Sequence, residues 1–331
     1  MSVTSILVIR LSAIGDIILT TPLVRQLRRK FPQAEIDFFI KPAYRSILAE
    51  NPYLSAVVSE PEKLKSQYDV VIDLQNNFRS SQIRKRRSSR VFCYQKRNWK
   101  KFLLVHFKVN VLKNNLPVPE RYLEAIAALD LSDDGFGCDY FITEKDRAFA
   151  EKAMAQKRKT LALCFGAKHF TKQYPPARYA EVINKLFAEQ PPVQILLLGG
   201  KEDAPLAKAI SANVADKTHL RDFSGQCTLG QTAALLACCD AVLTNDTGLM
   251  HMASAFGKKM VVIFGSSVRE FGFAPYRTPH KILEIPALAC RPCSHIGKSQ
   301  CPKKHFQCMN LITPESVVRA VREALSDSVD W

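Results

Sequence analysis

Short apolar segments alternate with longer segments of helical periodicity along most of the chain. The apolar segments include residues 5–10 (SILVIR), 68–73 (YDVVID), 160–165 (TLALCF) and 241–244 (AVLT). Short aliphatic and β-branched runs are typical of strands buried on both faces, and strands separated by helices pair in parallel. The alternation restarts after the basic segment 156–159. We therefore predict an α/β protein of two successive doubly wound units.

Two local features bear on element and domain boundaries. Around Pro22 the sequence allows two interpretations: the proline kinks a helix that continues from the preceding turn, or it begins a helix capped by Thr21. The basic segment between the two series of strands predicts the division into domains. We expect an N-terminal domain of residues 1–156, a C-terminal domain of residues 157–312 and a final helical segment, residues 313–331.

The composition is that of a globular protein, with 47% hydrophobic and 24% charged residues. No apolar run approaches the roughly 18 residues of a membrane span. The first residues lead directly into a strand pattern, without the apolar segment of a secretory signal. Ten cysteines without an export signal favour free thiols or metal ligands in a reducing compartment. We therefore expect a cytoplasmic protein.

Residues 74–119 form a basic region without a single Asp or Glu, in a chain whose net charge is +16. Its aromatic residues are interleaved with the charges. Such a region favours a polyanionic partner, which could be a phosphorylated lipid, an anionic membrane or a nucleic acid. The alternative is a solvated basic face without a partner. The base-stacking motifs of RNA-binding modules are missing, so we expect no nucleic acid. The twelve cations are Arg79, Arg84, Lys85, Arg86, Arg87, Arg90, Lys96, Arg97, Lys100, Lys101, Lys108 and Lys113.

The segment 241–257 (AVLTNDTGLMHMASAFG) predicts a strand that leads through a polar turn into a helix. Thr247 can cap this helix, and Gly248 lets a ligand approach the backbone. The N–H groups and partial positive charge of a helix start suit a phosphate or another anion. His251 lies one turn into the helix. The alternative interpretation is an ordinary capped helix with a core histidine.

Other strand ends offer polar groups that would meet at the carboxyl edges of the two sheets. The second unit has GAKHFTK at residues 166–172, whose Lys168 and Lys172 suit a diphosphate. The chain lacks the G-x-G-x-x-G fingerprint after its first strand and has no P-loop, which argues against a dinucleotide oxidoreductase. A nucleotide sugar fits better. Asp16 in the first unit could then serve as a base on an incoming hydroxyl, or simply cap a helix.

Four cysteines lie close together near the end of the sequence, with two histidines nearby. Their spacing is Cys290-x2-Cys293-x7-Cys301-x6-Cys308. The ligand types are those of a structural zinc site, but the second pair departs from the usual C-x2-C spacing. Buried packing cysteines are the alternative.

Four blocks follow one another in a fixed order along the chain. They are VIRLSAIGDIILTTPLVRQLRRKFP, GAKHFTKQYPPARYAEVINKL, NDTGLMHMASAFGK with the following VVIFG, and the cysteine segment. Together they resemble glycosyltransferase family 9, the heptosyltransferases that add heptose to the inner core of lipopolysaccharide. The resemblance implies a GT-B architecture, in which two Rossmann-like domains face a central cleft. It also implies that the last helix, expected at residues 314–325 behind the cap Thr313, packs back on the N-terminal domain.

The resemblance also implies roles for individual residues. Asp16 matches the proposed catalytic base of an inverting transfer that needs neither metal nor cofactor. The donor ADP-heptose would be bound by residues of the C-terminal domain. At two places this chain departs from the family's usual pattern, with Tyr174-Pro175 for Trp-Pro and Gly265-Ser266-Ser267 for Gly-Pro-Thr. The expected donor-binding residues are Lys172, Lys168, Asp246, Thr247, Gly248, His251, Glu202 and Cys227.

The expected acceptor is a phosphorylated Kdo-lipid A or lipopolysaccharide core. We expect it to be held by the basic region of the N-terminal domain, through Arg79, Arg84, Arg86 and Arg87. The protein would then work as a peripheral protein on the anionic inner face of the cytoplasmic membrane. A relative that uses another sugar nucleotide or another acidic glycan is the alternative within the family.

Overall fold

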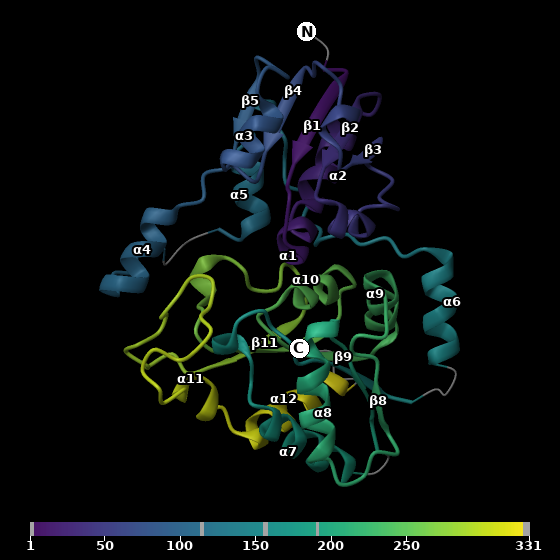
Figure 1. The fold of residues 1–331 in the computed structure, drawn as a ribbon, viewed down its shortest axis with the longest axis vertical. Helices are drawn as coiled ribbons and strands as arrows, with labels where there is room; N and C mark the ends of the chain where they lie inside the picture. The colour runs from purple at the N-terminus through teal and green to yellow at the C-terminus, as the bar shows by residue number, and fades with distance from the viewer. Residues whose placement is uncertain (1–2, 113–115, 155–157, 190–191, 327–331) are drawn as a thin grey trace. The chain divides into compact units, whose positions relative to one another are not determined.

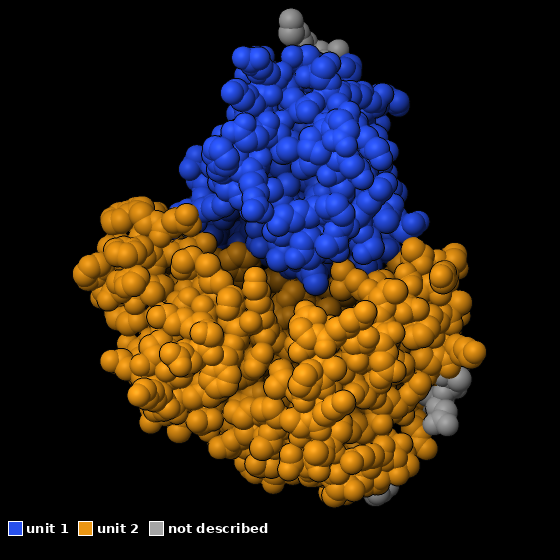
Figure 2. Space-filling view, viewed as in Figure 1, with its two compact units in different colours: residues 1–97, 116–141 blue, residues 98–115, 142–331 orange. Residues whose placement is uncertain are grey.

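The computed structural model describes residues 3–112, 116–154, 158–189 and 192–326. The chain forms two compact units, coloured separately in Figure 2: unit 1 is residues 1–97 and 116–141, and unit 2 is residues 98–115 and 142–331. This division differs from the predicted domains, because residues 98–115 and the helix after residue 142 belong to unit 2. The predicted boundary at 156 and 157 lies outside the described residues.

Unit 1 is built on a five-stranded parallel sheet of order β3-β2-β1-β4-β5 (Figure 1). The strand order reverses beside β1, so the carboxyl ends of β1 and β4 form the switch point where ligands of such sheets bind. The strands are β1 (Ser5–Ile9), β2 (Glu35–Phe39), β3 (Ala56–Val58), β4 (Val70–Asp73) and β5 (Val91–Cys93). The helices are α1 (Ile14–Ile18), α2 (Thr21–Lys30), α3 (Phe78–Arg84) and α5 (Val118–Glu124).

Unit 2 contains a six-stranded parallel sheet of order β11-β10-β9-β6-β7-β8, whose switch point lies between β9 and β6. The strands are β6 (Thr160–Cys164), β7 (Gln194–Leu197), β8 (Leu220–Asp222), β9 (Ala241–Asn245), β10 (Lys259–Phe264) and β11 (His280–Glu284). The helices are α4 (Asn98–Phe107), α6 (Glu144–Ala153), α7 (Pro176–Phe187), α8 (Ala204–Ala212), α9 (Leu229–Cys238), α10 (Gly248–Ala255), α11 (Gln307–Asn310) and α12 (Pro314–Leu325). The prediction of two parallel-sheet units is confirmed.

The segment around Pro22 is two helices, not one kinked helix. α1 ends at Ile18, and α2 begins at Thr21 with Pro22 in its first turn. A proline is tolerated there because the first N–H groups of a helix have no partner within the helix. Thr20, not Thr21, is the residue before the helix, and its hydroxyl donates to the carbonyl of Ile17 at 2.7 Å.

The last helix, α12, has the bounds and the cap that the sequence predicts. The Thr313 hydroxyl accepts a hydrogen bond from the Ser316 N–H at 3.2 Å. Within unit 2 the helix contacts α7, β9 and β10; the packing on the N-terminal domain that the resemblance implies stays a prediction. Val317 and Val321, one turn apart, are fully buried in the core of unit 2. The apolar face of α12 therefore packs against the sheet of unit 2.

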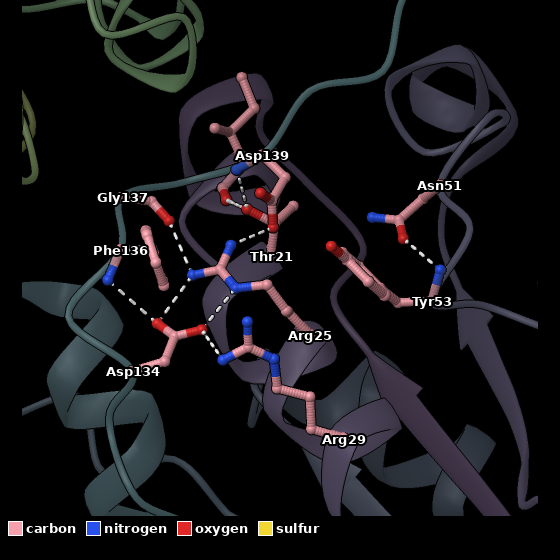
Figure 3. Close-up of polar contacts among 10 residues, drawn as sticks. Thr21, Arg25, Arg29, Asn51, Tyr53, Asp134, Phe136, Gly137 and Asp139 are labelled. Atoms are coloured by element: carbon pink, nitrogen blue, oxygen red, sulfur yellow. Dashed lines mark hydrogen bonds and ion pairs between the residues drawn. The ribbon is translucent and has the colours of Figure 1, made fainter. Parts of the chain in front are cut away.

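Arg25 on α2 ties the final segment of unit 1, residues 134–139, to the helix (Figure 3). Its guanidinium donates to the Asp134 carboxylate at 2.7 and 3.0 Å and pairs with Asp139. The Thr21 hydroxyl accepts a hydrogen bond from the Asp139 N–H at 2.8 Å. Burial favours the neutral Asp134 carboxyl, yet the pairing with Arg25 holds its pKa below the usual value. Arg25 itself is only 3% exposed, so its pairing with Asp134 is largely shielded from water.

Replacing Arg25 with leucine should destabilise unit 1, because it leaves the buried Asp134 carboxylate without its main partner. We expect the free energy of unfolding to fall by about 3 kcal/mol, measured by urea denaturation followed by circular dichroism. Arg29→Leu is the matched control, since the Arg29 side chain is half exposed and contacts the same carboxylate at 2.9 Å. It should cost less than about 1 kcal/mol. Equal losses in the two variants would contradict the importance of the buried network.

Candidate active site

The switch point of unit 2 is occupied by an ion pair between the loops that follow two neighbouring strands. Lys172 lies in the turn after β6, and Asp246 directly follows β9. The Lys172 ammonium lies 2.7 Å from Asp246 Oδ2. The carboxyl ends of parallel strands meet at one edge of a sheet, and therefore residues 74 positions apart in sequence come into contact here. These two predicted donor-site residues are brought together.

The Asp246 carboxylate is nearly buried, 9% exposed, and carries two charge-assisted contacts. Besides Lys172, it accepts a hydrogen bond from the Ser267 hydroxyl at 2.6 Å. Burial favours the neutral acid, but Lys172 and Ser267 together hold the pKa of Asp246 below its usual value. Asp246 is therefore a fixed anion that orients the Lys172 ammonium.

The turn around Asp246 is held by hydrogen bonds to the side chain of Asn245. Its amide oxygen accepts from the Tyr179 hydroxyl at 2.9 Å, and its amide nitrogen donates to the carbonyl of Phe165 at 2.6 Å. Thr247 then caps α10, accepting from the Leu249 N–H at 3.3 Å. These bonds aim the start of α10, beginning at Gly248, out of the carboxyl edge of the sheet.

His251 lies within α10 and is buried, 4% exposed. Its ring meets that of Phe273 edge to face, with the centroids 6.3 Å apart. This packing matches the interpretation of a core histidine that braces the turn. His251 also contributes to lowering the pKa of Asp246, after Lys172 and Ser267.

The Gly265-Ser266-Ser267 turn after β10 braces the loop that carries Lys172. The Ser266 hydroxyl lies 3.0 Å from that of Thr171, which also accepts from the Lys298 N–H at 2.9 Å. A Cβ at Gly265 would lie 2.4 Å from Met309 Cε and 2.9 Å from the Thr171 carbonyl oxygen, so a larger residue does not fit. Relative to the family's usual Gly-Pro-Thr, the turn gains the Ser266 hydroxyl, which contacts the loop of Lys172, and keeps a hydroxyl at Ser267, which contacts Asp246.

Three further predicted donor residues lie at the same edge of the sheet but outside the ion pair. Lys168 is exposed in the turn after β6, Glu202 is exposed in the turn after β7, and Cys227 is half-buried just before the cap of α9. Burial raises the pKa of the Cys227 thiol. The neighbouring Asp203 was not predicted: its carboxylate accepts from the Gly200 N–H at 2.9 Å and lies against Gly166, where a Cβ would clash.

The switch point of unit 1 holds a second ion pair, between Arg10 and Asp16. Arg10 follows β1 and Asp16 lies in α1, and their side chains approach to 2.7 Å. The same guanidinium donates to the carbonyls of Ser12 at 3.0 Å and Leu74 at 2.7 Å. Arg10 is therefore held rigidly between the ends of β1 and β4. The Asp16 side chain is 26% exposed, so the carboxylate remains accessible from solvent.

A pocket of about 410 Å³ opens at the same edge of unit 1. It is reached from the turn after β1, since Ser12, whose carbonyl accepts from Arg10, is part of its wall. Two cations, Lys41 from the end of β2 and Arg79 from α3, line it together with amide side chains. The lining residues are Leu11, Ser12, Lys41, Gln75, Asn77, Phe78 and Arg79.

The four predicted acceptor arginines have different surroundings. Arg79 lines the pocket of unit 1. Arg84 pairs at 2.9 Å with the fully buried Asp73, and Arg87 donates to backbone carbonyls, including that of Ile83 at 2.8 Å. Arg86 is exposed beyond the end of α3. The structure thus brings only Arg79 of the four to the pocket, and Arg84 and Arg87 hold unit 1 together.

The four clustered cysteines line one small pocket of unit 2 beside His305. Cys290 Sγ lies 3.9 Å from His305 Nε2, and burial raises the pKa of the Cys308 thiol to about 11. Among the residues that the structure describes, no three His, Cys, Asp or Glu side chains are arranged to hold a metal ion. The loop is anchored by the buried Arg291, which donates to the carbonyls of Gly265 and Ser267 at 2.6 and 2.8 Å.

Sequence reasoning missed Arg10, Asn245, Ser267 and Lys41. Arg10 had a visible signal, because it is a lone charge at the end of an apolar strand. Asn245 had one too, as an amide between a buried strand and a cap. The partners of Ser267 and Lys41 depend on which strands are neighbours, which the order of residues does not state.

Comparisons with known proteins agree with this arrangement. The profile of glycosyltransferase family 9 (heptosyltransferase) matches residues 59–304. Lipooligosaccharide heptosyltransferase 2 of Haemophilus ducreyi is 28% identical, over 97% of this chain and 99% of that protein. The comparisons with solved structures give the fold.

A family 9 glycosyltransferase from Veillonella parvula superposes with a TM-score of 0.79 at 20% identity, covering 99% of both chains. The ADP-heptose lipopolysaccharide heptosyltransferase II of Escherichia coli gives 0.76 at 24% identity, covering 97% of this chain and 98% of that one. The two α/β units therefore have the GT-B fold of these enzymes. With its family profile matched over most of its length, this chain belongs to glycosyltransferase family 9, the heptosyltransferases.

Proposed function

We propose that this glycosyltransferase transfers heptose from ADP-heptose to the inner core of lipopolysaccharide, with inversion at the anomeric carbon. The names of its relatives supply the donor and acceptor classes. The observation that carries the proposal is the Lys172–Asp246 pair at the switch point of unit 2, beside the start of α10. It offers a fixed cation and backbone N–H groups to a diphosphate.

Unit 2 would bind the donor through this pair. The Lys172 ammonium and the helix start at Thr247-Gly248 would stabilise the negative charge that develops on the leaving ADP. The exposed Lys168 would add a second cation to the diphosphate. Glu202 would lie near the ribose and Cys227 near the adenine, as the family resemblance implies. His251 would support the turn from within α10.

Asp16 of unit 1 would act as the general base. It removes the proton from an acceptor hydroxyl, whose oxygen attacks the anomeric carbon while the bond from that carbon to the ADP oxygen breaks. The proton ends on Asp16, and ADP leaves with the bonding electron pair. Arg10 positions the carboxylate and leaves one face of it open to solvent.

The pocket at the carboxyl edge of the unit 1 sheet would bind the acceptor. Lys41 and Arg79 supply positive charge, and Gln75 and Asn77 supply amide hydrogen bonds, which together suit a phosphorylated or carboxylated sugar. Because a lipid-linked acceptor is anchored in a bilayer, the enzyme would work as a peripheral protein on the anionic cytoplasmic face of the membrane. None of the described helices combines the length and hydrophobicity needed to cross a bilayer.

Replacing Asp16 with asparagine should lower kcat for heptose transfer by at least about a thousandfold, since the base is lost while the shape is kept. The measurement is transfer from ADP-heptose to a defined truncated core acceptor, with ADP affinity determined in parallel. ADP affinity should stay within about twofold. Asp130→Asn removes the same charge from an exposed site of unit 1 and should leave kcat unchanged. Transfer retained by the Asp16 variant would refute its role as base.

Replacing Lys172 with methionine should weaken ADP binding by roughly 10- to 100-fold, the value of a lost charge-assisted hydrogen bond. The thermal shift induced by ADP measures this, and UDP, GDP and CDP tested beside it report the choice of nucleotide. Lys185→Met, at an exposed lysine of α7, is the control. The single variant leaves the buried Asp246 carboxylate without its cation. The double variant Lys172→Met/Asp246→Asn removes that carboxylate as well. If the double variant binds ADP normally, the diphosphate site lies elsewhere.

The double variant Lys41→Met/Arg79→Met should raise KM for the acceptor by at least about tenfold, with ADP affinity unchanged. The two cations attract the acidic acceptor, so the dependence of KM on salt should also become weaker. Lys85→Met/Arg86→Met removes two charges from the exposed end of α3 and serves as the control. A larger effect in this control would place the acceptor outside the pocket.

A further inference from the structure

Helix α4 carries apolar side chains on two opposite faces. One face packs on unit 2, where Leu104 joins Leu112 and Phe271 in a buried cluster. On this face the Lys101 ammonium also lies over the ring of Phe273, 5.8 Å from its centroid. The opposite face follows the helical spacing i, i+3, i+4, i+7, i+8. It presents Trp99, Phe102, Leu103, His106 and Phe107.

The opposite face is strongly exposed. Trp99 is 66% exposed, Phe102 52% and Phe107 64%, and Val109 and Val111 continue the exposed surface beyond the helix. We call the five side chains of Trp99, Phe102, Phe107, Val109 and Val111 the α4 outer face. They are five of the eleven exposed large apolar side chains in the described part of the chain, gathered within 13 residues. Such clustering marks an interaction site, whereas scattered exposure does not.

The α4 outer face rests on a rigid support. The Lys108 ammonium donates to the carbonyls of Val105 at 2.8 Å and Pro292 at 2.7 Å, which fixes the helix end to the cysteine loop. Phe102 packs against His106 and Phe107, with ring centroids 4.4 and 6.0 Å away. The exposed aromatic side chains are therefore carried by a packed helix.

The chemistry of this surface fits a lipid bilayer. Trp and Phe are typical of helices that lie in the interface of a membrane, with basic residues beside them. Residues 98–112 contain three lysines and no acidic residue, in a chain of net charge +16. Such a surface is attracted to anionic headgroups. The ten residues of α4 span about 15 Å, half the thickness of the hydrocarbon core, so the helix would lie along the surface.

We propose that the α4 outer face docks the enzyme on an anionic lipid bilayer by inserting Trp99, Phe102 and Phe107 among the headgroups. The inference rests on the proposed function in one respect, which is that a lipid-linked acceptor brings the enzyme to a bilayer. It assigns docking to α4 of unit 2, separately from the acceptor pocket of unit 1.

The test compares binding of the full-length protein to vesicles of phosphatidylethanolamine and phosphatidylglycerol that contain no lipopolysaccharide. Trp99→Ser/Phe107→Ser should weaken binding, measured by cosedimentation, by at least tenfold. Phe136→Ser/Leu311→Ser is the matched control, since these side chains are 62% and 51% exposed on other elements, and it should bind like the parent protein. In a Trp331→Phe background, Trp99 fluorescence should shift to shorter wavelength on these vesicles and not on phosphatidylcholine alone.

Unchanged vesicle binding by the α4 variant, or an equal loss in the control, would overturn the proposal. So would a dimeric parent protein that becomes monomeric in the α4 variant, because a second copy would then cover this face. The α4 variant should transfer heptose normally to a water-soluble core oligosaccharide. Because the vesicles hold neither donor nor acceptor, failure of that transfer in the parent protein would refute the proposed function and leave the docking result intact.

Discussion

In each unit a carboxylate at the switch point of the sheet is held 2.7 Å from a cation, and the exposure of the pair decides what it can do. In unit 2 the Asp246 carboxylate is buried, so its charge is tolerated only with Lys172 and Ser267 beside it. In unit 1 the burial is reversed: Arg10 is buried and Asp16 is partly exposed. The pair in unit 2 is thereby a fixed electrostatic site, while the pair in unit 1 leaves the Asp16 carboxylate able to accept a proton.

Both pairs depend on strand order, which explains what the sequence could and could not predict. The strands, the start of α10 and the polar turn at Asp246 follow from local patterns of apolar and capping residues. The family resemblance assigned Lys172 and Asp246 separately to the donor site. Their contact was not predicted, since nothing in the local sequence shows that β6 and β9 are neighbours. Arg10 carried a local signal as a lone charge at the end of an apolar strand, but its partner Leu74 could not be foreseen, because Leu74 follows β4, which pairs with β1 only in the folded sheet.

In the basic region, the number of charges does not show how many cations are available to a partner, because each cation has its own surroundings. The sequence presents residues 74–119 as one basic segment, but its two parts fold into different units. Arg84 neutralises the buried Asp73, and Arg87 donates to backbone carbonyls, so both side chains are already engaged within the protein. α4 was not predicted, because a helix with apolar side chains on both faces has little periodic contrast. The property that distinguishes this region is therefore where its aromatic residues point.

The structure distinguishes the two neighbouring acids Glu202 and Asp203, of which the resemblance assigned Glu202 to the donor site. Either carboxylate follows β7 closely enough to meet a ligand at the edge of the sheet. Asp203 is used within the protein, because it accepts from the Gly200 N–H and fills the space that the missing Cβ of Gly166 leaves open. Its burial raises the pKa of the carboxyl. Glu202 is exposed, so of the two acids it is the one open to a ligand, as the proposed ribose contact requires.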